Sequence, residues 1–366
     1  MKIQITREQL LPALQAVIGV VERRQTLPVL ANVLVVADEA GLSLTTTDLE
    51  VELVSRVELA VEEGGQVTVP ARKLMDIVRN LPDGAVIKLA VDQERAVLQA
   101  ERSRFSLATL PASEFPAVED IGATEPVVLP QASLRELIER THFSMALQDV
   151  RYYLNGLLLE LEPGRLRAVA TDGHRLALGE LEGQVEVTNN QQVIVPRKGV
   201  QELLRLLDES DESLRLELGS NHIRITLQNL RFTSKLIDGR FPEYQRVIPQ
   251  VESNILRADR ETLRQALVRA SILSNEKYRG VRFILETDLL RIQSNNPEQE
   301  QADEELVVEY QGAPLEVGFN ATYLLDALGV LDGDAVQIGL VDANSSCLIG
   351  AVGVDHFRYV VMPMRL

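Results

Sequence analysis

The sequence predicts an α+β protein that contains three tandem copies of one domain, each with two helices and a mainly antiparallel sheet. The main observation is internal repetition, because segments of similar pattern recur at a period near 124 residues. In each copy a strand runs into a helix and then a polar turn, as in TVPARKLMDIVRNLPDG, IVPRKGVQELLRLLDES and GFNATYLLDALGVLDGD. Pro70, Pro196 and Asn320 occupy the same place near the helix start. Proline pre-sets φ there and asparagine can cap, so both suit a helix entry.

A second amphipathic helix precedes this one in every copy. The stretch from Thr6 to Gln9 has the pattern of a capping box, which opens a helix. Apolar residues then recur at helical spacing along one stripe. The stripes are Leu10, Leu14, Val17 and Val21 in the first copy, Leu134, Leu137, Ile138 and Thr141 in the second, and Leu263, Ala266, Leu267 and Ala270 in the third.

Strands are predicted after both helices of each copy. Those after the first helix carry Asp48, Asp172 and Asn296 at spacings of 124 residues, and those after the second end in RFSLATLP, RFTSKLID and FRYVVMPM. Two stretches, 111–126 and 238–254, are rich in proline and acidic residues and lack a helical period, which is typical of linkers. The expected domains are therefore 1–122, 123–250 and 251–366.

Composition indicates a globular protein. The chain has 366 residues, of which 45% are hydrophobic, and this is enough for each copy to bury a core. No apolar run approaches the roughly 18 residues of a membrane span, and the start has no signal peptide, so we expect no membrane contact and a cytoplasmic location. The single cysteine, Cys347, is expected to be a small buried residue. Neither a phosphate-binding glycine loop nor a zinc motif is present, so no cofactor and no metal are expected.

The distribution of charge separates the predicted helices from the rest of the chain. The net charge is −17, but the six helix windows together carry +5, which leaves −22 elsewhere. Ordinary solvated helix faces are the simpler interpretation for any one helix. Recurrence in all copies favours a basic helical layer that attracts a polyanion without reading its sequence. Basic residues face away from apolar ones as follows: Arg72, Lys73 and Arg79 from Leu74, Ile77, Val78 and Leu81; Arg197, Lys198 and Arg205 from Leu203, Leu204 and Leu207; and Arg260, Arg264 and Arg269 from Leu263 and Leu267.

Two other classes of function were considered. An enzyme could use Asp172 and His174 as an acid/base pair with Thr171 or Ser144 as the nucleophile, but no nucleophile elbow or oxyanion motif accompanies them. An acidic scaffold that binds only proteins would explain the net charge. It would leave the basic helices unexplained.

Several strings identify the family. TLPVLANVLV, RSRFSLATLP, QDVRYYLNG, ATDGHRLAL, FTSKLIDGRFPEY, ILSNEKYRGVR and YVVMPMRL together resemble the bacterial DNA polymerase III β subunit, the β sliding clamp, from end to end. The resemblance implies the DNA clamp fold and a head-to-tail homodimer, closed into a ring with helices inside and sheets outside. It implies a processivity factor that encircles double-stranded DNA without sequence specificity and has no catalytic site. Expected partners, bound through short peptide motifs, are the replicative polymerase α subunit, the clamp loader, other polymerases and repair proteins.

The same resemblance assigns residues to three surfaces. Tyr152 and Tyr153 could instead pack in the core. Tyr278 and Asn344 stand at the rim of the cleft, where the best-known member of the family has Phe and Val. Arg102 and Arg104 are expected near the acidic run 298–305 of a second subunit. The predicted DNA-facing residues are Arg24, Arg72, Lys73, Arg79, Gln148, Tyr152, Tyr153, Arg197 and Lys198; the peptide cleft contains Leu154, Thr171, Gly173, His174, Arg175, Leu176, Pro242, Arg246, Val247, Tyr278, Asn320, Tyr323, Val360, Met362, Pro363 and Met364; and the dimer interface contains Phe105, Leu107, Ile272 and Leu273.

Overall fold

The computed structural model describes residues 1–22, 27–92, 94–116, 121–122, 125–183, 185–251 and 253–365. Its contacts divide the chain into two compact units, one formed by Met1–Ala132 with Lys198–Leu236 and the other by Ser133–Arg197 with Ile237–Leu366. The division passes through the second copy, because some of its strands pair with the first copy and others with the third. Among the described residues, no helix combines the length and apolar character that crossing a bilayer requires.

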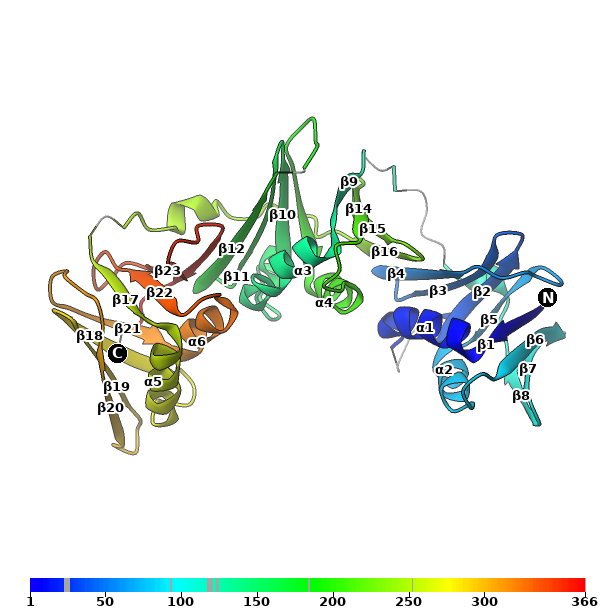
Figure 1. The fold of residues 1–366 in the computed structure, drawn as a ribbon, viewed down its shortest axis with the longest axis horizontal. Coiled ribbons are helices and arrows are strands. Elements are labelled where there is room, and N and C mark those ends of the chain that lie inside the picture. The colour runs from blue at the N-terminus through cyan, green and yellow to red at the C-terminus, as the bar shows by residue number, and fades with distance from the viewer. Residues whose placement is uncertain are drawn as a thin grey trace. The chain divides into compact units, whose positions relative to one another are not determined.

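The first unit contains two antiparallel sheets, and the larger one continues from the first copy into the second (Figure 1). Its order is β5-β2-β3-β4-β16-β15-β14-β9, and β4 is the strand that pairs with β16. The smaller sheet has the order β1-β6-β7-β8, so β8 is an edge strand. The strands are β1 (Lys2–Thr6), β2 (Asn32–Asp38), β3 (Gly41–Thr47), β4 (Val51–Val57), β5 (Gly65–Pro70), β6 (Val86–Asp92), β7 (Arg95–Ala100), β8 (Ser103–Ala108), β9 (Val127–Pro130), β14 (Ser213–Leu218), β15 (His222–Leu227) and β16 (Leu230–Lys235).

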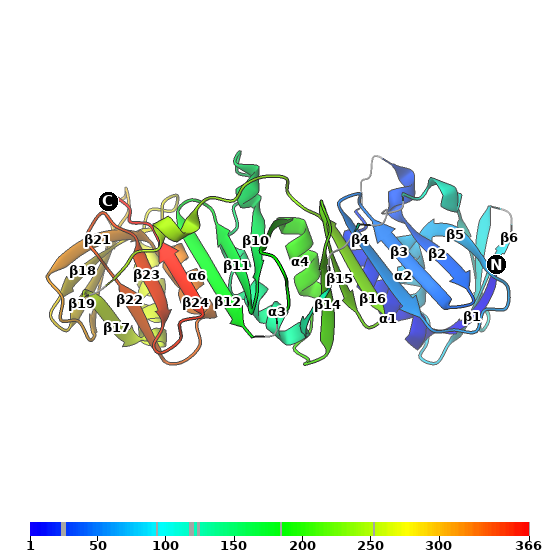
Figure 2. The same ribbon diagram turned by 90° about the horizontal axis from the view of Figure 1, so that it is seen from above.

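The second unit repeats this arrangement with the second and third copies. Its larger sheet has the order β13-β10-β11-β12-β24-β23-β22-β17, and β12 pairs with β24 across the copies (Figure 2). The smaller sheet has the order β20-β19-β18-β21, so β20 is an edge strand. The strands are β10 (Gly156–Glu162), β11 (Arg165–Thr171), β12 (Arg175–Glu182), β13 (Gln191–Pro196), β17 (Ile255–Asp259), β18 (Gly280–Glu286), β19 (Leu289–Asn295), β20 (Gln301–Val307), β21 (Leu315–Asn320), β22 (Ala335–Gly339), β23 (Cys347–Ala351) and β24 (Phe357–Val361).

Each copy supplies two α-helices, as the repeat predicts. The predicted capping box is present, since the Thr6 hydroxyl accepts from the Gln9 amide at 3.3 Å. The Asn320 side chain caps its helix by accepting from the amide of Thr322 at 2.8 Å. The helices are α1 (Arg7–Val17), α2 (Ala71–Arg79), α3 (Gln131–Glu139), α4 (Arg197–Leu206), α5 (Arg260–Ile272) and α6 (Ala321–Val330), and short 3₁₀ turns are η1 (Ile18–Val20), η2 (Pro28–Ala31), η3 (Ala112–Glu114), η4 (His142–Ser144), η5 (Tyr152–Asn155) and η6 (Tyr244–Val247).

Several details of the predicted helix stripes differ in the structure. Val21, Leu81, Thr141 and Leu207 are buried, but each lies beyond the helix expected to carry it, because α1, α2, α3 and α4 end earlier. Ile77 and Leu204 are only partly buried. Met75, which the stripe did not include, is buried instead, because the core-facing side of α2 is wider than the predicted stripe.

The three equivalent polar residues after β3, β11 and β19 have the same role in each copy. The Asp48 carboxylate accepts from the amides of Glu50 and Val51, at 2.9 and 2.7 Å. The Asp172 carboxylate accepts from His174 and Arg175 at 2.9 and 3.0 Å, and the Asn296 side chain accepts from the Glu300 amide at 2.9 Å. Side chains of this type satisfy backbone donors in turns, which explains why the position is polar in every copy.

In the described residues of the two predicted linker stretches, the regular elements are short 3₁₀ turns, and each stretch packs against the core. Phe115 is buried against Val29 and Leu30 in the first unit. Phe241 and Tyr244 are buried in a cluster of the second unit, with Leu176 and Val360. These stretches are therefore parts of the packed structure as well as connections.

Candidate functional site

One apolar cavity of about 170 Å³ lies in the second unit, where the turn between β11 and β12 meets β24. Its floor crosses the junction between copies, since Leu176 on β12 pairs in register with Val360 on β24. Both residues belong to a buried cluster that continues beneath the cavity. The lining residues are Arg151, Leu154, Thr171, Gly173, His174, Arg175, Leu176, Pro242, Glu243, Tyr244, Val247, Ser346, Val360 and Met362.

One wall of the cavity is formed by the segment 237–248. Its Ile237 amide donates to the Ile194 carbonyl on β13 at 2.9 Å. Phe241 and Tyr244 then turn inward and meet edge to face, with ring centroids 6.5 Å apart. Pro242 and Val247, which flank them, line the cavity.

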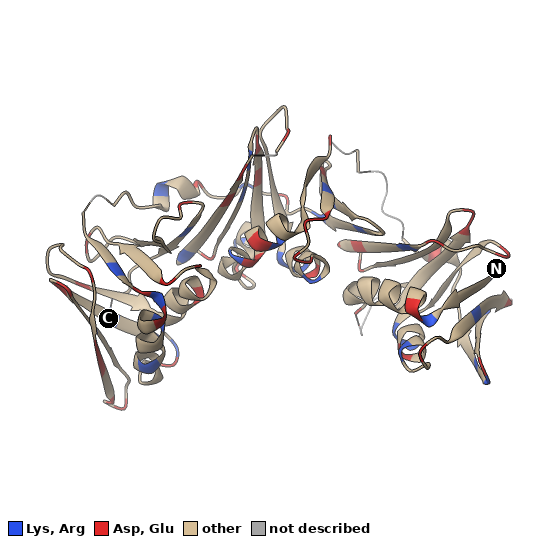
Figure 3. Ribbon diagram, in the orientation of Figure 1, with Lys and Arg blue, Asp and Glu red and all other residues tan. Residues whose placement is uncertain are grey.

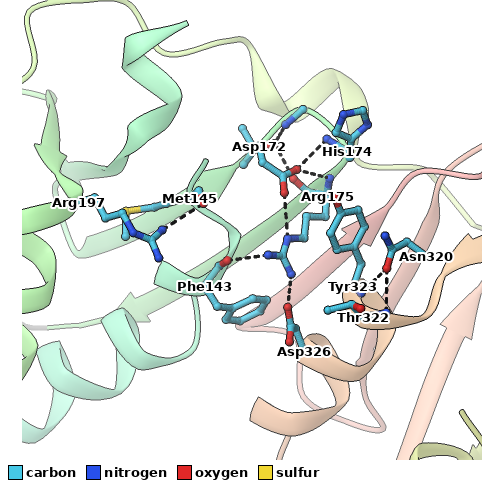
Figure 4. A network of polar contacts seen from close by, with 12 residues as sticks. Phe143, Met145, Asp172, His174, Arg175, Arg197, Asn320, Thr322, Tyr323 and Asp326 are labelled. Carbon is cyan, nitrogen blue, oxygen red and sulfur yellow. Dashed lines mark hydrogen bonds and ion pairs between the residues drawn. The ribbon is translucent and has the colours of Figure 1, made fainter. Parts of the chain in front are cut away.

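Arg175 holds the rim of the cavity (Figure 4). Its guanidinium donates to the Asp172 carboxylate at 3.1 Å and to the Phe143 carbonyl at 2.9 Å, and it pairs with Asp326 on α6. It also lies over the ring of Tyr323, 4.5 Å from the centroid. Only 13% of the Arg175 side chain is exposed. A shielded arginine with this many partners fixes the β11–β12 turn to the third copy.

A row of charged side chains crosses the sheet beside the buried cluster. Glu160 on β10 is 2% exposed and accepts from Arg167 at 2.8 Å and from Gln192 at 2.6 Å. Arg167 also donates to Glu180 at 2.6 Å and to the Tyr244 hydroxyl at 2.7 Å, while that hydroxyl donates to Glu160. Burial and the contact with Glu160 raise the pKa of Tyr244. The phenol therefore stays neutral and donates its proton.

Ten of the sixteen residues predicted for the peptide cleft line this cavity. The other six do not line it. Asn320 caps α6, Tyr323 stacks with Arg175, and the Met364 amide donates to the Gly318 carbonyl. Tyr278 is 53% exposed beside Lys277, and neither Arg246 nor Pro363 is among the lining residues.

Arg151, Glu243, Tyr244 and Ser346 line the cavity and were not predicted. The sequence does contain a signal for Tyr244, because Phe241 and Tyr244 are two aromatic residues three positions apart in a polar linker. Asn344 lies in the same loop as Ser346, and its amide donates to Asp342.

The loop before β10 has one exposed and one packed tyrosine. Tyr152 is 56% exposed, whereas Tyr153 is partly buried and packs against the buried cluster. Gln148 has a φ of 55°, which fits a tight turn. Arg151 holds the loop by donating twice to Asp149, at 2.8 and 3.0 Å, and these hydrogen bonds lower the pKa of Asp149 to about 2.

The basic side chains of the helices are less free than their sequence suggests. Arg72, Lys73 and Arg79 on α2 are exposed, as predicted, although Arg79 pairs with Asp76 at 2.5 Å. Lys198 on α4 is only 35% exposed and pairs with Glu22 and Asp48. Arg197 donates to the Met145 carbonyl at 3.3 Å. Arg24 lies outside the described residues.

The helices are nonetheless the positive part of the chain (Figure 3). The six α-helices of the described ranges carry eleven basic and seven acidic residues, a net charge of +4 in a chain of −17. In the third copy, Arg264 and Arg269 pair with Glu261 and Glu304, and Arg260 donates to the Gly333 and Leu328 carbonyls. All three basic residues of α2 are exposed, although the Arg72 guanidinium also donates to the Val21 carbonyl.

The residues predicted for the dimer interface lie on the edge strand β8 and at the end of helix α5. On β8, Phe105 is partly buried and Leu107 is 9% exposed, which shows that Leu107 packs within its own unit. Ile272, at the end of α5, is 70% exposed, and Leu273 is partly buried. On β20, Glu304 and Glu305 already pair with Arg269 and Arg291.

Residues that could serve as catalytic groups of an enzyme have structural roles in this chain. The Asp172 carboxylate is committed to its own turn and to Arg175, and the Thr171 hydroxyl donates to the Arg175 carbonyl at 2.6 Å. Ser144 is 1% exposed, and burial raises the pKa of the Cys347 thiol to about 12. In the part of the chain that the structure describes, no cluster of His, Cys, Asp and Glu could hold a metal ion.

Sheets that continue from copy to copy, net positive helices and one apolar cavity define a modular binding protein. Models of the DNA polymerase III beta subunit match the chain throughout, with the N-terminal domain at residues 1–119, the central domain at 128–243 and the C-terminal domain at 245–365. The chain belongs to this family, the β sliding clamps.

Full-length relatives agree with this assignment. The chain is 55% identical to the beta sliding clamp of Pseudomonas putida and 51% identical to that of Escherichia coli, with 100% of both chains covered in each case. A sliding clamp of Pseudomonas aeruginosa solved with a ligand has a TM-score of 0.98 and 54% identity, and one bound to griselimycin has 0.97 and 55%, each over 100% of both chains.

Family membership confirms the three-copy α+β clamp fold. It also confirms the predicted role as a processivity clamp of DNA replication, a subunit that is not itself catalytic. A clamp of this kind works with DNA and a polymerase.

Proposed function

We propose that two copies of this chain close head to tail into a ring, with helices facing the hole, and that the ring encircles double-stranded DNA without reading its sequence. The observation that carries this proposal is the net charge of +4 on the α-helices of a chain whose total is −17. A positive layer on a negative protein attracts a polyanion to one surface and repels it elsewhere. The proposed domain limits remain 1–122, 123–250 and 251–366.

Weak contact with phosphates would allow the ring to move along DNA. Each phosphate that a protein neutralises adds to a salt-dependent affinity, so a tight grip would stop movement along DNA. The internal ion pairs of Lys198 with Glu22 and Asp48 reduce the positive charge available to DNA. Arg72 and Lys73 are the strongest candidates for phosphate contact, with Tyr152 available for stacking on an exposed base. Arg24, Arg79, Gln148, Tyr153, Arg197 and Lys198 complete the proposed DNA-facing set.

The proposed dimer joins the edge strands β8 and β20. Each edge strand exposes backbone donors and acceptors that a second strand can satisfy. Arg102 and Arg104 on one side are exposed bases, and Glu298 and Glu300 on the other are exposed acids. Phe105 and Ile272 would supply apolar contact between the subunits.

The test of the ring is retention on DNA. After loading by a clamp loader, the protein should remain on circular DNA through a high-salt wash and should leave linear DNA through its ends. Equal loss from both forms of DNA would contradict a topological link.

We further propose that the cavity of the second unit binds short peptides of the polymerase α subunit, the clamp loader, other polymerases and repair proteins in the cytoplasm. An apolar floor with a few polar groups at the rim is typical of a ligand site. Griselimycin, which is bound in sliding clamps of Pseudomonas aeruginosa and Bartonella birtlesii, is a suitable probe. A calorimetric titration should show binding that an α-subunit peptide competes away, and binding of both at once would contradict a shared site.

A further inference from the structure

The segment 237–248 forms a wall of the cavity but is held by few backbone contacts. We propose that Tyr244 positions this wall: its hydroxyl fastens the segment to the Glu160–Arg167 pair, and this attachment sets how tightly the cavity holds a ligand. The inference rests on the proposed peptide binding and adds a residue whose role is to position others.

The backbone of the segment is weakly anchored. Its hydrogen bond to another element is the one from Ile237 to Ile194, at 2.9 Å. Further along, the Tyr244 amide donates to Pro242 at 2.7 Å and the Arg246 amide donates to Glu243 at 3.3 Å, both within the segment itself. Among the described residues these are turn contacts and not strand pairing, so side chains must hold the segment in place.

The acceptor for Tyr244 is unusually fixed. Glu160 is 2% exposed and is held from both sides by Arg167 and Gln192. Arg167 is held in turn by Glu180, which also pairs with Arg358 at 3.2 Å. The row therefore runs from β13 through β10, β11 and β12 to β24, and it crosses the junction between the second and third copies.

The Tyr244 hydroxyl closes a small ring of hydrogen bonds. It accepts from Arg167 at 2.7 Å and donates to Glu160, while Arg167 donates to Glu160 at 2.8 Å. Removal of the hydroxyl would leave a shielded carboxylate and a shielded guanidinium each short of one partner. Groups of this kind lose more by being left unpaired than a neutral hydrogen bond contributes.

The same residue reaches the cavity. The Tyr244 ring lies in the buried cluster with Leu176 and Val360, the floor residues. Pro242, Glu243 and Val247, its near neighbours in the chain, line the wall. A wall that is fixed before the ligand arrives does not have to be ordered on binding, and this raises affinity.

The test compares Tyr244→Phe with Tyr310→Phe. Tyr310 is a matched control, because it is buried to a similar degree and donates its hydroxyl to the Ala313 carbonyl at 2.7 Å, away from the cavity lining. Griselimycin should bind Tyr244→Phe about tenfold more weakly, through faster dissociation, and amide hydrogen exchange in 237–248 should become faster. Tyr310→Phe should change neither quantity.

Variants of Glu160, the acceptor of the Tyr244 hydroxyl, give a second comparison of griselimycin affinity. Glu160→Gln keeps an acceptor for the Tyr244 hydroxyl and should lose less affinity than Glu160→Ala, which should resemble Tyr244→Phe. Unchanged griselimycin affinity in Tyr244→Phe would overturn the inference. Weaker binding with unchanged exchange in 237–248 would also overturn it, since the hydroxyl would then affect the ligand without anchoring the segment.

Failure of the wild-type protein to bind griselimycin would count against the proposed peptide site, and it would be seen before any variant is compared. The exchange rates of 237–248 in Tyr244→Phe would still decide the anchoring role in that case. Faster exchange would support the anchor, and unchanged exchange would overturn it.

Discussion

The two eight-stranded sheets join their copies in the same way but carry different side chains at the junction. In the first unit Glu52 on β4 lies opposite Thr233 on β16, and in the second Leu176 on β12 lies opposite Val360 on β24. Glu52 and Leu176 stand 124 residues apart, at the period of the repeat. Glu52 is 4% exposed and pairs with Arg231 at 3.4 Å.

The surroundings of the two junctions differ accordingly. A groove of about 310 Å³ beside the first junction is lined by four arginines and other polar residues together with Val54, Leu227 and Leu230, whereas the cavity at the second has an apolar floor. The backbone arrangement therefore does not by itself create the apolar cavity. A few side chains on shared strands make one junction apolar and leave the other charged.

Placing the acidic residue of the first junction at the equivalent position of the second should have the largest effect on ligand binding. Leu176→Glu is expected to weaken griselimycin binding by more than about 100-fold, roughly 3 kcal/mol, because it places a carboxylate in the floor while Arg358 is already paired with Glu180. Calorimetry measures this loss. Glu52→Leu, the reverse change in the other sheet, should leave the titration unchanged, and binding that survives Leu176→Glu would show that the floor is misassigned.

The two junctions also differ at Arg175, because the equivalent residue of the first copy is Val51. Arg175→Ala should lower the free energy of unfolding of the second unit by about 2–4 kcal/mol, since Asp172 and Asp326 lose a shielded partner. Urea unfolding measures the change. The matched control is Arg264→Ala, which breaks a more exposed pair with Glu261 and should cost far less, because solvent screens an exposed ion pair. Similar losses in both variants would argue against a special role for Arg175.

The loop beside the cavity should show an unusual titration. Hydrogen bonds from Arg151 lower the pKa of Asp149 to about 2, so its contribution to stability is present above the ordinary value near 3.8 and is lost as pH falls toward 2. Carboxyl-carbon NMR should place the Asp149 midpoint far below that of a solvated aspartate. Arg151→Ala removes the side-chain bonds but keeps the Arg151 amide as a donor, so it should raise the midpoint part of the way toward the ordinary value. An ordinary midpoint in the wild type would mean that the pair does not form in solution.

The smallest expected effect is on DNA affinity, through a change in the first unit. Glu22→Gln removes one of the two carboxylates that hold Lys198 and should raise DNA affinity by about threefold, with a salt dependence steeper by at most about one phosphate. Binding to a short duplex at several salt concentrations measures both quantities. Glu309→Gln, an exposed acid of the second unit, serves as the control for net charge alone. Equal gains in the two variants would mean that Glu22 acts only through the total charge.

The repeat, the helices and the strand pattern could be predicted because they depend on local signals. Capping residues such as Thr6 and Asn320 mark helix starts, and alternation marks strands. The pairing of β4 with β16 and of β12 with β24 joins segments far apart in the chain, and no local pattern specifies it. The prediction therefore gave three separate domains and missed the sheets that link them.

The site was predicted in part for a related reason. Family resemblance supplied the residues of the floor and the turn, but it placed Asn320 and Tyr323 in the lining, where the structure uses them to cap α6 and to hold Arg175. Tyr244 was overlooked because a proline-rich stretch was taken for a simple linker. The charges of the helices were counted without the acids that neutralise Lys198, which come from other elements.

The stoichiometry of ligand binding tests the central claim most directly. Native mass spectrometry with excess griselimycin should show two chains that carry two ligands, one for each second junction, and Leu176→Glu should show two chains with none. Four ligands per dimer, or equal loading of the wild type and Leu176→Glu, would contradict the claim that the side chains at one junction make the site.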